Sequence, residues 1–311
     1  MRLGVLDIGS NTVHLLVADA RPGGRPLATT SEKSVLRLMR YLDDRGAITD
    51  AGVTAILRAV RKAKRVAAQE GVAELVATAT SAVREARNGP EVIARIEDVI
   101  GQPLQVLGGA DEARLTFLAV RRWFGWSAGR ILLFDIGGGS LEIAGGSEEL
   151  PQAAESVPLG AGRMTIGFLP KAPPGERALE RLRGHAAEVL RPVAKRFAKL
   201  PRPDHVVGSS KTIRSLARLA GPRRPGWAEM ERGMLPRESL ASWIPVLARI
   251  PATARQELPG ITADRTFQIT AGAVVLHEAM ASLGVEELEV SPWALREGVM
   301  LRRIEELEIR G

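Results

Sequence analysis

Short apolar runs and stretches of helical periodicity alternate along the chain. Residues 3–17 form an apolar run broken at positions 7–11 by an acid, a glycine and two small polar residues, which predicts a strand, a tight turn and a second strand. Residues 32–42 mix β-branched and basic side chains and suggest a third strand. In residues 49–70 the apolar positions recur at helical spacing after an Asp/Thr start signal, which predicts an amphipathic helix. Further strands and helices follow, so the pattern predicts a mixed α/β fold.

The strand–turn–strand pattern occurs a second time. Residues 131–134 lead into an Asp-Ile-Gly-Gly-Gly-Ser turn at positions 135–140, and residues 141–144 lead out of it. The first turn, at positions 7–12, is Asp-Ile-Gly-Ser-Asn-Thr, so the two share their opening residues and their flanking strands. Two such units suggest a duplicated domain with one phosphate-binding loop in each half, and residues 125–129 are the expected boundary.

Small residues in both turns point to an anion bound against the backbone. Glycine allows a ligand to approach closely, and successive amides and hydroxyls can hold phosphate oxygens. For either turn alone, an ordinary hairpin with a polar tip is the plain alternative. Three consecutive glycines between apolar strands contribute no side chains to the core. Close approach of a bound ligand to the backbone is a common reason for such glycines. A third candidate anion site opens a helix at Ser209, Ser210, Lys211 and Thr212, with a plain helix cap as its alternative.

Composition narrows the class of protein. The 311 residues are 45% hydrophobic and 25% charged, which is typical of a globular protein of about two domains. No cysteine is present, which excludes thiol catalysis, disulfides and Cys-ligated metal sites and fits a reducing compartment. An early acid at Asp7 argues against a signal peptide, and no apolar stretch reaches about 18 residues, so we expect a cytoplasmic protein without membrane contact.

A basic surplus suggests an anionic partner. Lys and Arg number 43 against 36 Asp and Glu, which gives a formal charge of +7. One cluster of basic residues contains Arg58, Arg61, Lys62, Lys64 and Arg65. Another contains Arg191, Lys195, Arg196, Lys199 and Arg202. Each cluster is interpreted either as a solvated helix face or as a surface that guides a polyanion. Residues 221–226 are predicted to form a Pro/Arg loop.

Six segments, taken in order, carry a resemblance to a known family. They are Leu6-Asp7-Ile8-Gly9-Ser10-Asn11-Thr12-Val13-His14-Leu15, Ala77-Thr78-Ala79-Thr80-Ser81-Ala82-Val83-Arg84, Asp111-Glu112-Ala113-Arg114-Leu115, Phe134-Asp135-Ile136-Gly137-Gly138-Gly139-Ser140-Leu141-Glu142, Pro158-Leu159-Gly160-Ala161-Gly162-Arg163 and Leu295-Arg296-Glu297-Gly298. Together they resemble the exopolyphosphatase/guanosine pentaphosphate phosphohydrolase (Ppx/GppA) family. Related sugar and acetate kinases share the two loops but lack the Glu-Ala-Arg and Leu-Arg-Glu-Gly segments.

The resemblance implies a fold and a domain organisation. The fold is α/β, with duplicated ribonuclease-H-like domains of the actin–hexokinase–Hsp70 type that enclose an interdomain cleft. Domain I is expected at residues 1–125 and is completed by the C-terminal helix at 298–311, and domain II is expected at residues 126–297.

The resemblance also implies roles for charged residues. Glu112 would be the base that orients and deprotonates the attacking water, whereas from the residues alone it is also explained as a helix N-terminal acid. Asp135 and Glu142 would bind magnesium, and Asp7 would share that duty. For Glu142 the alternative is a solvated strand residue. Arg84 would face the terminal phosphates with its guanidinium group.

The remaining implied phosphate contacts come from the three loops and from one further arginine. They are Asp7, Gly9, Ser10, Asn11, Thr12, Gly137, Gly138, Gly139, Ser140, Ser209, Ser210, Lys211, Thr212 and Arg265. Three positions depart from the family pattern. Lys211 replaces a usual glycine, Asp111 replaces the first Glu of Glu-Glu-Ala-Arg, and Phe267 replaces an Asp near Arg265.

The implied function is that of an exopolyphosphatase, which hydrolyses the terminal phosphoanhydride of inorganic polyphosphate and releases orthophosphate with magnesium. Because the chain stops at Gly311, without the helical extension of larger relatives, we expect short chains as the better substrates. Guanosine pentaphosphate is the alternative substrate, and binding of (p)ppGpp is a related expectation. Other classes are a small-molecule kinase and a non-catalytic polyphosphate or alarmone sensor. Nucleic acid is not expected, while a monovalent cation and a homodimer are further candidates.

Overall fold

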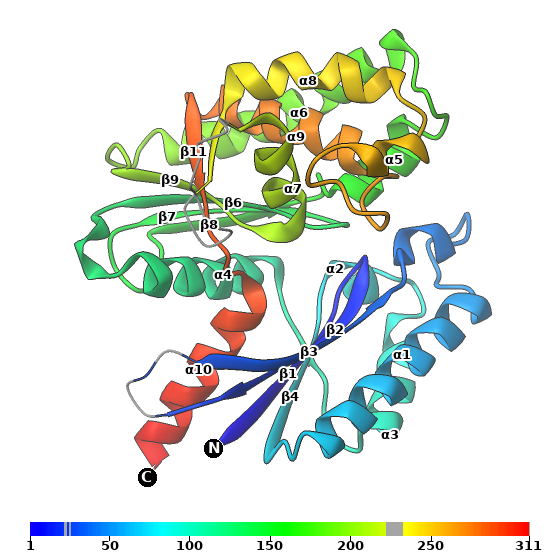
Figure 1. Cartoon of the computed structure of the whole chain (residues 1–311), viewed down its shortest axis with the longest axis vertical. Helices are drawn as coiled ribbons and strands as arrows, with labels where there is room; N and C mark the ends of the chain where they lie inside the picture. The colour runs from blue at the N-terminus through cyan, green and yellow to red at the C-terminus, as the bar shows by residue number, and fades with distance from the viewer. Residues whose placement is uncertain (22–23, 25, 222–232, 311) are drawn as a thin grey trace. The chain divides into compact units, whose positions relative to one another are not determined.

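The computed structural model describes residues 1–21, 24, 26–221 and 233–310 (Figure 1). Residues 222–226 of the predicted Pro/Arg loop therefore lie outside the described residues, as does Gly311 of the predicted terminal helix. The chain divides into two compact units, each with its own sheet and core. Unit 1 comprises Met1–Thr116 and Leu295–Gly311, and unit 2 comprises Phe117–Ala294. The division falls within helix α4 (Gly109–Phe124), and the expected boundary at residues 125–129 directly follows that helix.

Unit 1 is built on a five-stranded sheet in the order β3-β2-β1-β4-β5. Its strands are β1 (Arg2–Ile8), β2 (Thr12–Asp19), β3 (Leu27–Val35), β4 (Glu74–Ala79) and β5 (Gln105–Val106). The first three strands form an antiparallel meander, and β4 and β5 run parallel to β1 and to each other. The hairpin predicted at the start of the chain is thus confirmed.

The two faces of the unit 1 sheet have separate cores. Alternate side chains of β1 point to opposite faces, so Leu6 and Ile8 join a cluster with α1 (Asp50–Gln69) and α3 (Gly89–Ile100). The other face packs against α10 (Leu295–Arg310) (Figure 1). The predicted helix at 49–70 is confirmed as α1, which begins where the Thr49 side chain accepts a hydrogen bond from the Gly52 amide.

The predicted third strand is wrong in its bounds. It lies at Leu27–Val35 rather than at residues 32–42, and a 3-10 helix, η1 (Leu38–Tyr41), follows it. The Leu36 amide donates to the Asn11 carbonyl in register with the ladder, and the chain leaves the sheet at Arg37, whose amide donates to the same carbonyl. Arg37 then takes a left-handed conformation with φ 58°, which ends the strand geometry.

Unit 2 repeats this topology in a six-stranded sheet with the order β10-β11-β9-β6-β7-β8. The strands are β6 (Ile131–Ile136), β7 (Leu141–Gly146), β8 (Ala153–Val157), β9 (His205–Gly208), β10 (Met234–Pro236) and β11 (Glu287–Val290). Strands β8, β7 and β6 form the antiparallel meander, and β9 and β11 run parallel to β6. These five correspond in order and direction to the five strands of unit 1, so the predicted duplication is confirmed in the sheets.

Helices cover the unit 2 sheet and form its core. They are α5 (Ala161–Phe168), α6 (Glu176–Phe197), α7 (Ser210–Ala220), α8 (Arg237–Arg249) and α9 (Ile269–Ser282). The buried helix α9 packs among the others, and the cluster includes Phe134 and Ile143 from the sheet (Figure 1). Within the described ranges, no helix has both the length and the apolar character that crossing a membrane requires.

Candidate active site

Loop 1, residues 9–12, closes the β1–β2 hairpin with a defined geometry. The Gly9 amide donates to the Thr12 carbonyl at 2.9 Å, and the carbonyls of Ser10 and Asn11 accept from the segment that leads into η1. In a planar trans peptide the carbonyl and the next amide point in opposite directions. The amides of Asn11 and Thr12 therefore point away from η1, which suits an anion bound on that side.

Loop 1 lies beside the start of α2 (Ser81–Arg84), because β4 runs parallel to β1 and ends at the same edge of the sheet. The hydroxyls of Ser10 and Ser81 are both buried and lie 3.1 Å apart. The Thr80 amide also donates to the Ile8 carbonyl. Ser81 had no role in the sequence-based interpretation, although it belongs to one of the six segments.

Arg84 and Glu112 are brought together in unit 1. Arg84 ends α2 and donates to the carbonyl of Leu107, and its Nη1 lies 3.8 Å from Glu112 Oε2. Glu112 occupies the first turn of α4 and is only 9% exposed. The neighbouring Asp111 is exposed and pairs with Arg114 at 2.9 Å. The two adjacent acids therefore have different surroundings, and a helix N-terminal preference for acids does not account for the burial of Glu112 beside a guanidinium group.

A residue without a role in the sequence-based interpretation reaches Asp7. The helices α10 and α4 contact so closely that a Cβ on Gly298 would lie 1.9 Å from the Leu115 carbonyl oxygen, which only glycine allows. This contact fixes the first turn of α10, where Arg296 Nη1 lies 3.8 Å from Asp7 Oδ2. The Leu-Arg-Glu-Gly segment was the available signal, but nothing in its spacing identifies the partner of its arginine.

Loop 2, residues 137–140, has the same closure as loop 1. The Gly137 amide donates to the Ser140 carbonyl at 2.9 Å. The three glycine carbonyls accept hydrogen bonds from the start of α5, two from the backbone amides of Ala161 and Arg163 and one from the Arg163 side chain. By the same peptide geometry, the amides that follow these carbonyls point to the other side of the loop. Loop 2 is therefore arranged to donate several amides toward an anion.

Asp135 and Glu142 lie directly opposite each other on β6 and β7. Ser209 Oγ donates to Asp135, and Ser156 Oγ donates to Glu142 at 2.9 Å. Glu142 is 1% exposed, which excludes the alternative of a solvated strand residue. Like charges that face each other across a strand pair are destabilising, so this arrangement fits a cation.

The carboxylate pair also fits the preferences of a particular metal. Magnesium is held by hard oxygen ligands, and it commonly takes one or two carboxylates together with substrate phosphates and water. No group of three or more His, Cys, Asp or Glu residues that could hold a metal occurs in the described part of the chain. Asp7, the third predicted ligand, belongs to unit 1, where it faces Arg296.

Loop 3, residues 209–212, has mixed roles. Ser209 is fully buried and bonds Asp135, whereas the hydroxyl of Ser210, the first residue of α7, accepts from the Ile213 amide. Thr212 lies in the core, where its methyl group would be 2.7 Å from a Cβ on Gly272.

Lys211 and Arg265 share a carboxylate that the sequence-based interpretation did not single out. Lys211 Nζ lies 3.1 and 3.3 Å from the two oxygens of Asp264, and Arg265 Nε lies 3.6 Å from Oδ2. Arg265 is 8% exposed. The structure therefore brings Arg265 next to loop 3 through Asp264, while the position of Phe267 supplies no carboxylate.

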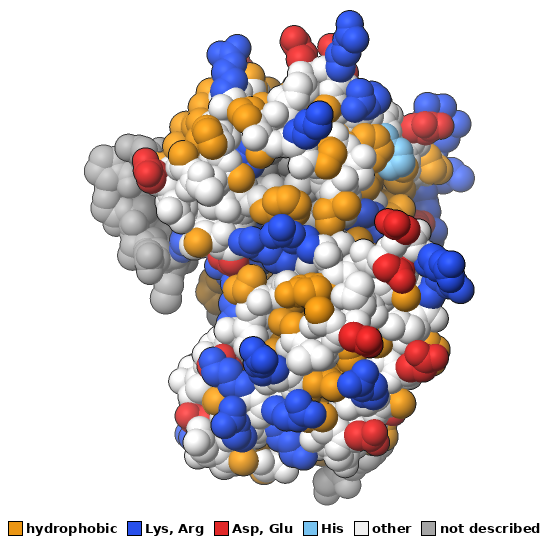
Figure 2. Space-filling view, turned by 90° about the vertical axis from the view of Figure 1, so that its right-hand side faces the viewer, with side chains coloured by type: hydrophobic (Ala, Val, Ile, Leu, Met, Phe, Trp, Pro, Cys, Tyr) orange, Lys and Arg blue, Asp and Glu red, His pale blue; other side chains and the backbone are white. Residues whose placement is uncertain are grey.

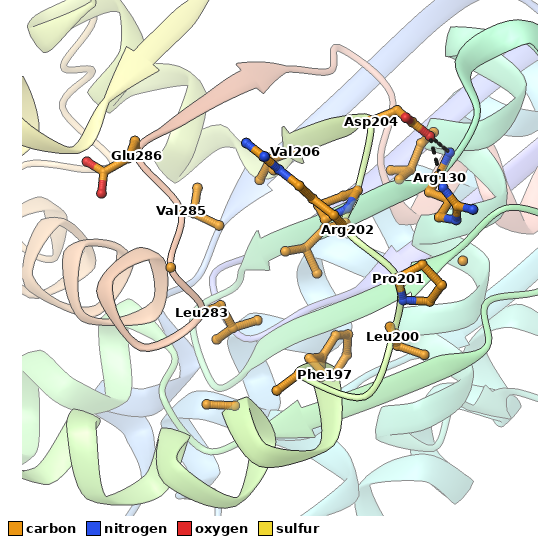
Figure 3. A pocket seen from close by; sticks show the side chains of 18 of the residues that line it. Arg130, Phe197, Leu200, Pro201, Arg202, Asp204, Val206, Leu283, Val285 and Glu286 are labelled. Carbon is orange, nitrogen blue, oxygen red and sulfur yellow. Dashed lines mark hydrogen bonds and ion pairs between the residues drawn. The ribbon is translucent and has the colours of Figure 1, made fainter.

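A cavity of about 760 Å³ lies elsewhere in unit 2 (Figure 3). It is lined by the beginning of β6, by the segment that follows α6, and by the segment that connects α9 to β11. Arg202 extends across it, and Arg130 and Asp204 form an ion pair at its edge (Figure 3). Loops 2 and 3 follow the carboxyl ends of β6 and β9, so this cavity is separate from the candidate active site.

Two duplicated sheets, each with an amide-rich loop after its first strand, define an α/β protein of the actin–hexokinase–Hsp70 class. The model of the Ppx/GppA phosphatase family matches residues 16–307. The chain is 48% identical over 305 residues to Exopolyphosphatase 1 of Mycobacterium tuberculosis, covering 98% of this chain and 89% of that protein, and 47% identical to its namesake in Mycobacterium leprae. An exopolyphosphatase structure from Cytophaga hutchinsonii matches with a TM-score of 0.88 and 26% identity over 98% of each chain. An Aquifex aeolicus family member matches with a TM-score of 0.79 and 24% identity, again over 98% of each. The chain belongs to the Ppx/GppA phosphatase family.

Proposed function

We propose that the protein is an exopolyphosphatase, which hydrolyses the terminal phosphoanhydride bond of inorganic polyphosphate and releases orthophosphate. The observation that carries the proposal is the pairing of buried Glu112 with Arg84 in a chain 48% identical to proteins named Exopolyphosphatase 1. A pure polyphosphate or alarmone sensor has no need of a buried carboxylate beside the phosphate-binding groups. Removal of the terminal phosphate of guanosine pentaphosphate uses the same chemistry and is the second candidate.

The residues of unit 1 have complementary roles in this proposal. Glu112 orients a water molecule and accepts its proton as the oxygen attacks the terminal phosphorus. The Arg84 guanidinium donates hydrogen bonds to the terminal phosphate oxygens, where negative charge develops in the transition state. Loop 1 binds phosphate oxygens through its amides, and Arg296 balances the charge of Asp7.

The residues of unit 2 supply further groups that suit a phosphate anion and a metal ion. Loop 2 donates the amides of Gly138, Gly139 and Ser140, and Arg265 and Lys211 add positive charge beside loop 3. Asp135 and Glu142 would hold magnesium. When bound, this ion would neutralise negative charge on the transferred phosphoryl group.

One assay tests the proposal. Phosphate release is measured with magnesium from tripolyphosphate, long polyphosphate, guanosine pentaphosphate and ATP, with chelation by EDTA as a further arm. Glu112→Gln should lower kcat by roughly 100-fold or more, as expected for loss of a general base. Asp111→Asn is the matched control, since Asp111 lies next in the chain but is exposed and pairs with Arg114. Equal rates for wild type and Glu112→Gln would refute the mechanism, and ATP-dependent phosphorylation of a small molecule would indicate a kinase.

The proposal includes a cytoplasmic location and a homodimer. Cell fractionation tests the first, and analytical ultracentrifugation of the purified protein tests the second.

A further inference from the structure

A groove on unit 1 is lined by four cations. It lies between α1 and the end of α3 and has a volume of about 700 Å³. Arg58, Arg61, Lys64 and Arg65 line it, and none of the side chains that line it is acidic or aromatic. Figure 2 shows Lys and Arg side chains gathered on the lower part of the face in view. We call this feature the α1 groove.

The three arginines of the α1 groove form one exposed stripe. Arg58, Arg61 and Arg65 are spaced by three and four residues, so they follow one side of the helix over about 10 Å. Across the described residues, none of the three lies within ion-pair distance of a carboxylate. Lys62, on a different side, pairs with Glu32 at 2.6 Å. Like charges at this spacing destabilise a helix, so α1 retains an unfavourable arrangement that an anion would relieve.

The helix dipole does not explain this stripe. Cations are favoured in the last turn of a helix, and the last turn of α1 contains none. The second basic cluster, which begins on α6 and continues past its end, is different. Lys195 and Arg196 lie in the last turn of α6, and Arg196 also bonds Glu155. Helix stabilisation and ion pairing account for Lys195 and Arg196, whereas neither accounts for the arginines of the α1 groove.

We propose that the α1 groove binds inorganic polyphosphate at a site separate from the catalytic residues. The inference rests on the proposed function, because the polymer that is the substrate at the catalytic residues is also the ligand of the α1 groove. A linear polyanion carries charge at every unit and presents no base, which suits a row of arginines without an aromatic platform. Binding of single-stranded nucleic acid usually adds such stacking. A long chain engaged at two sites gains effective concentration, so the groove lowers KM for long chains and leaves kcat unchanged.

The test compares two variants that lose the same charge. The groove variant carries Arg58→Gln, Arg61→Gln and Arg65→Gln, and glutamine keeps helix propensity. The control variant carries Arg191→Gln and Lys195→Gln on exposed positions of α6 and Lys199→Gln at an exposed position just after the helix. Both are placed in the inactive Glu112→Gln background for binding measurements with long polyphosphate, tripolyphosphate and a single-stranded RNA. Circular dichroism melting verifies that both fold.

The groove variant should bind long polyphosphate roughly tenfold more weakly, and the slope of log Kd against log salt should fall by about 2. Tripolyphosphate binding should not change, and the control variant should change by less than about twofold. In the active background KM for long chains should rise by the same factor. Equal losses in both variants, or none in the groove variant, would overturn the proposal. Loss confined to RNA would assign the groove to nucleic acid instead. If the groove variant loses binding but wild type releases no phosphate, the proposed function fails and the groove assignment stands.

Discussion

Gly160→Ala should displace loop 2 without straining the backbone of residue 160. Gly160 has φ −64° and ψ 143°, which alanine adopts freely. The added methyl, however, would lie 2.2 Å from the carbonyl carbon of Gly139 and 2.4 Å from two loop nitrogens. Real Cβ contacts are essentially never shorter than 3.0 Å, so the loop or the start of α5 must move by about 0.8 Å. That shift lengthens or bends the hydrogen bonds that Ala161 and Arg163 donate to loop 2.

The expected cost follows from this geometry. Overpacking of a tight contact lowers the free energy of unfolding by about 1–3 kcal/mol. A displacement near 1 Å in a reacting site lowers the rate by roughly 100-fold. We therefore expect kcat for phosphate release to fall by about that factor while the protein still folds. Thermal unfolding and steady-state kinetics measure the two effects.

Gly167→Ala is the matched control for this substitution. Gly167 lies in the same helix, α5, and a Cβ there meets nothing within 4 Å. Alanine in a helix is more favourable than glycine by roughly 0.5–1 kcal/mol, so this variant should be slightly more stable and fully active. If Gly160→Ala matched Gly167→Ala in both stability and kcat, the assignment of loop 2 as a rigid, α5-supported phosphate site would be wrong.

Two further predictions concern charged residues of unit 1. Arg296→Gln should lower kcat/KM about tenfold, because the negative charge of Asp7 then lacks its positive partner. Arg302→Gln, on the exposed side of α10, is the control and should leave kcat/KM unchanged. Equal activities of the two variants in a phosphate-release assay would contradict the role of Arg296. The amide of Ala47, and next that of Arg45, donate to Asp43 and lower its pKa, so the ionised form stabilises the fold above the unfolded pKa of about 3.9. This contribution is lost as pH falls through the lowered pKa. Asp43→Asn should therefore weaken the decrease in melting temperature below about pH 4, and an unchanged pH profile would refute this.

Local patterns were enough to predict the elements that carry the two main loops. A polar tip inside an apolar run specifies a hairpin, and the repeat of Asp-Ile-Gly specified the duplication. The helix at Asp50–Gln69 followed from its apolar period and its Thr49 cap. The third strand was misplaced because the left-handed conformation of Arg37, whose amide shares the Asn11 carbonyl with that of Leu36, turns the chain out of the sheet.

Contacts between distant segments could not be predicted. Arg296 meets Asp7 only because Gly298 lets α10 approach α4, and the sequence gives no distance between these helices. Asp264 joins Lys211 to Arg265 in the same way, through the fold of unit 2. The expectation of short chains as the better substrates stays a prediction, whereas the α1 groove favours long ones. The kinetic comparison of both substrates decides between them.

The split of unit 1 between the two ends of the chain has a consequence for synthesis on the ribosome. Val299, Met300 and Ile304 of α10 cover Leu3 and Val5 on one face of β1. While residues 295–304 are still untranslated, that apolar face of the first sheet lacks the cover that α10 provides, although its hairpin has long emerged. Unit 2 is a continuous segment and can complete its core earlier. The usual order, in which the N-terminal part of a chain folds first, is thus reversed for completion, and part of the apolar surface of the first sheet stays exposed until α10 has been synthesised.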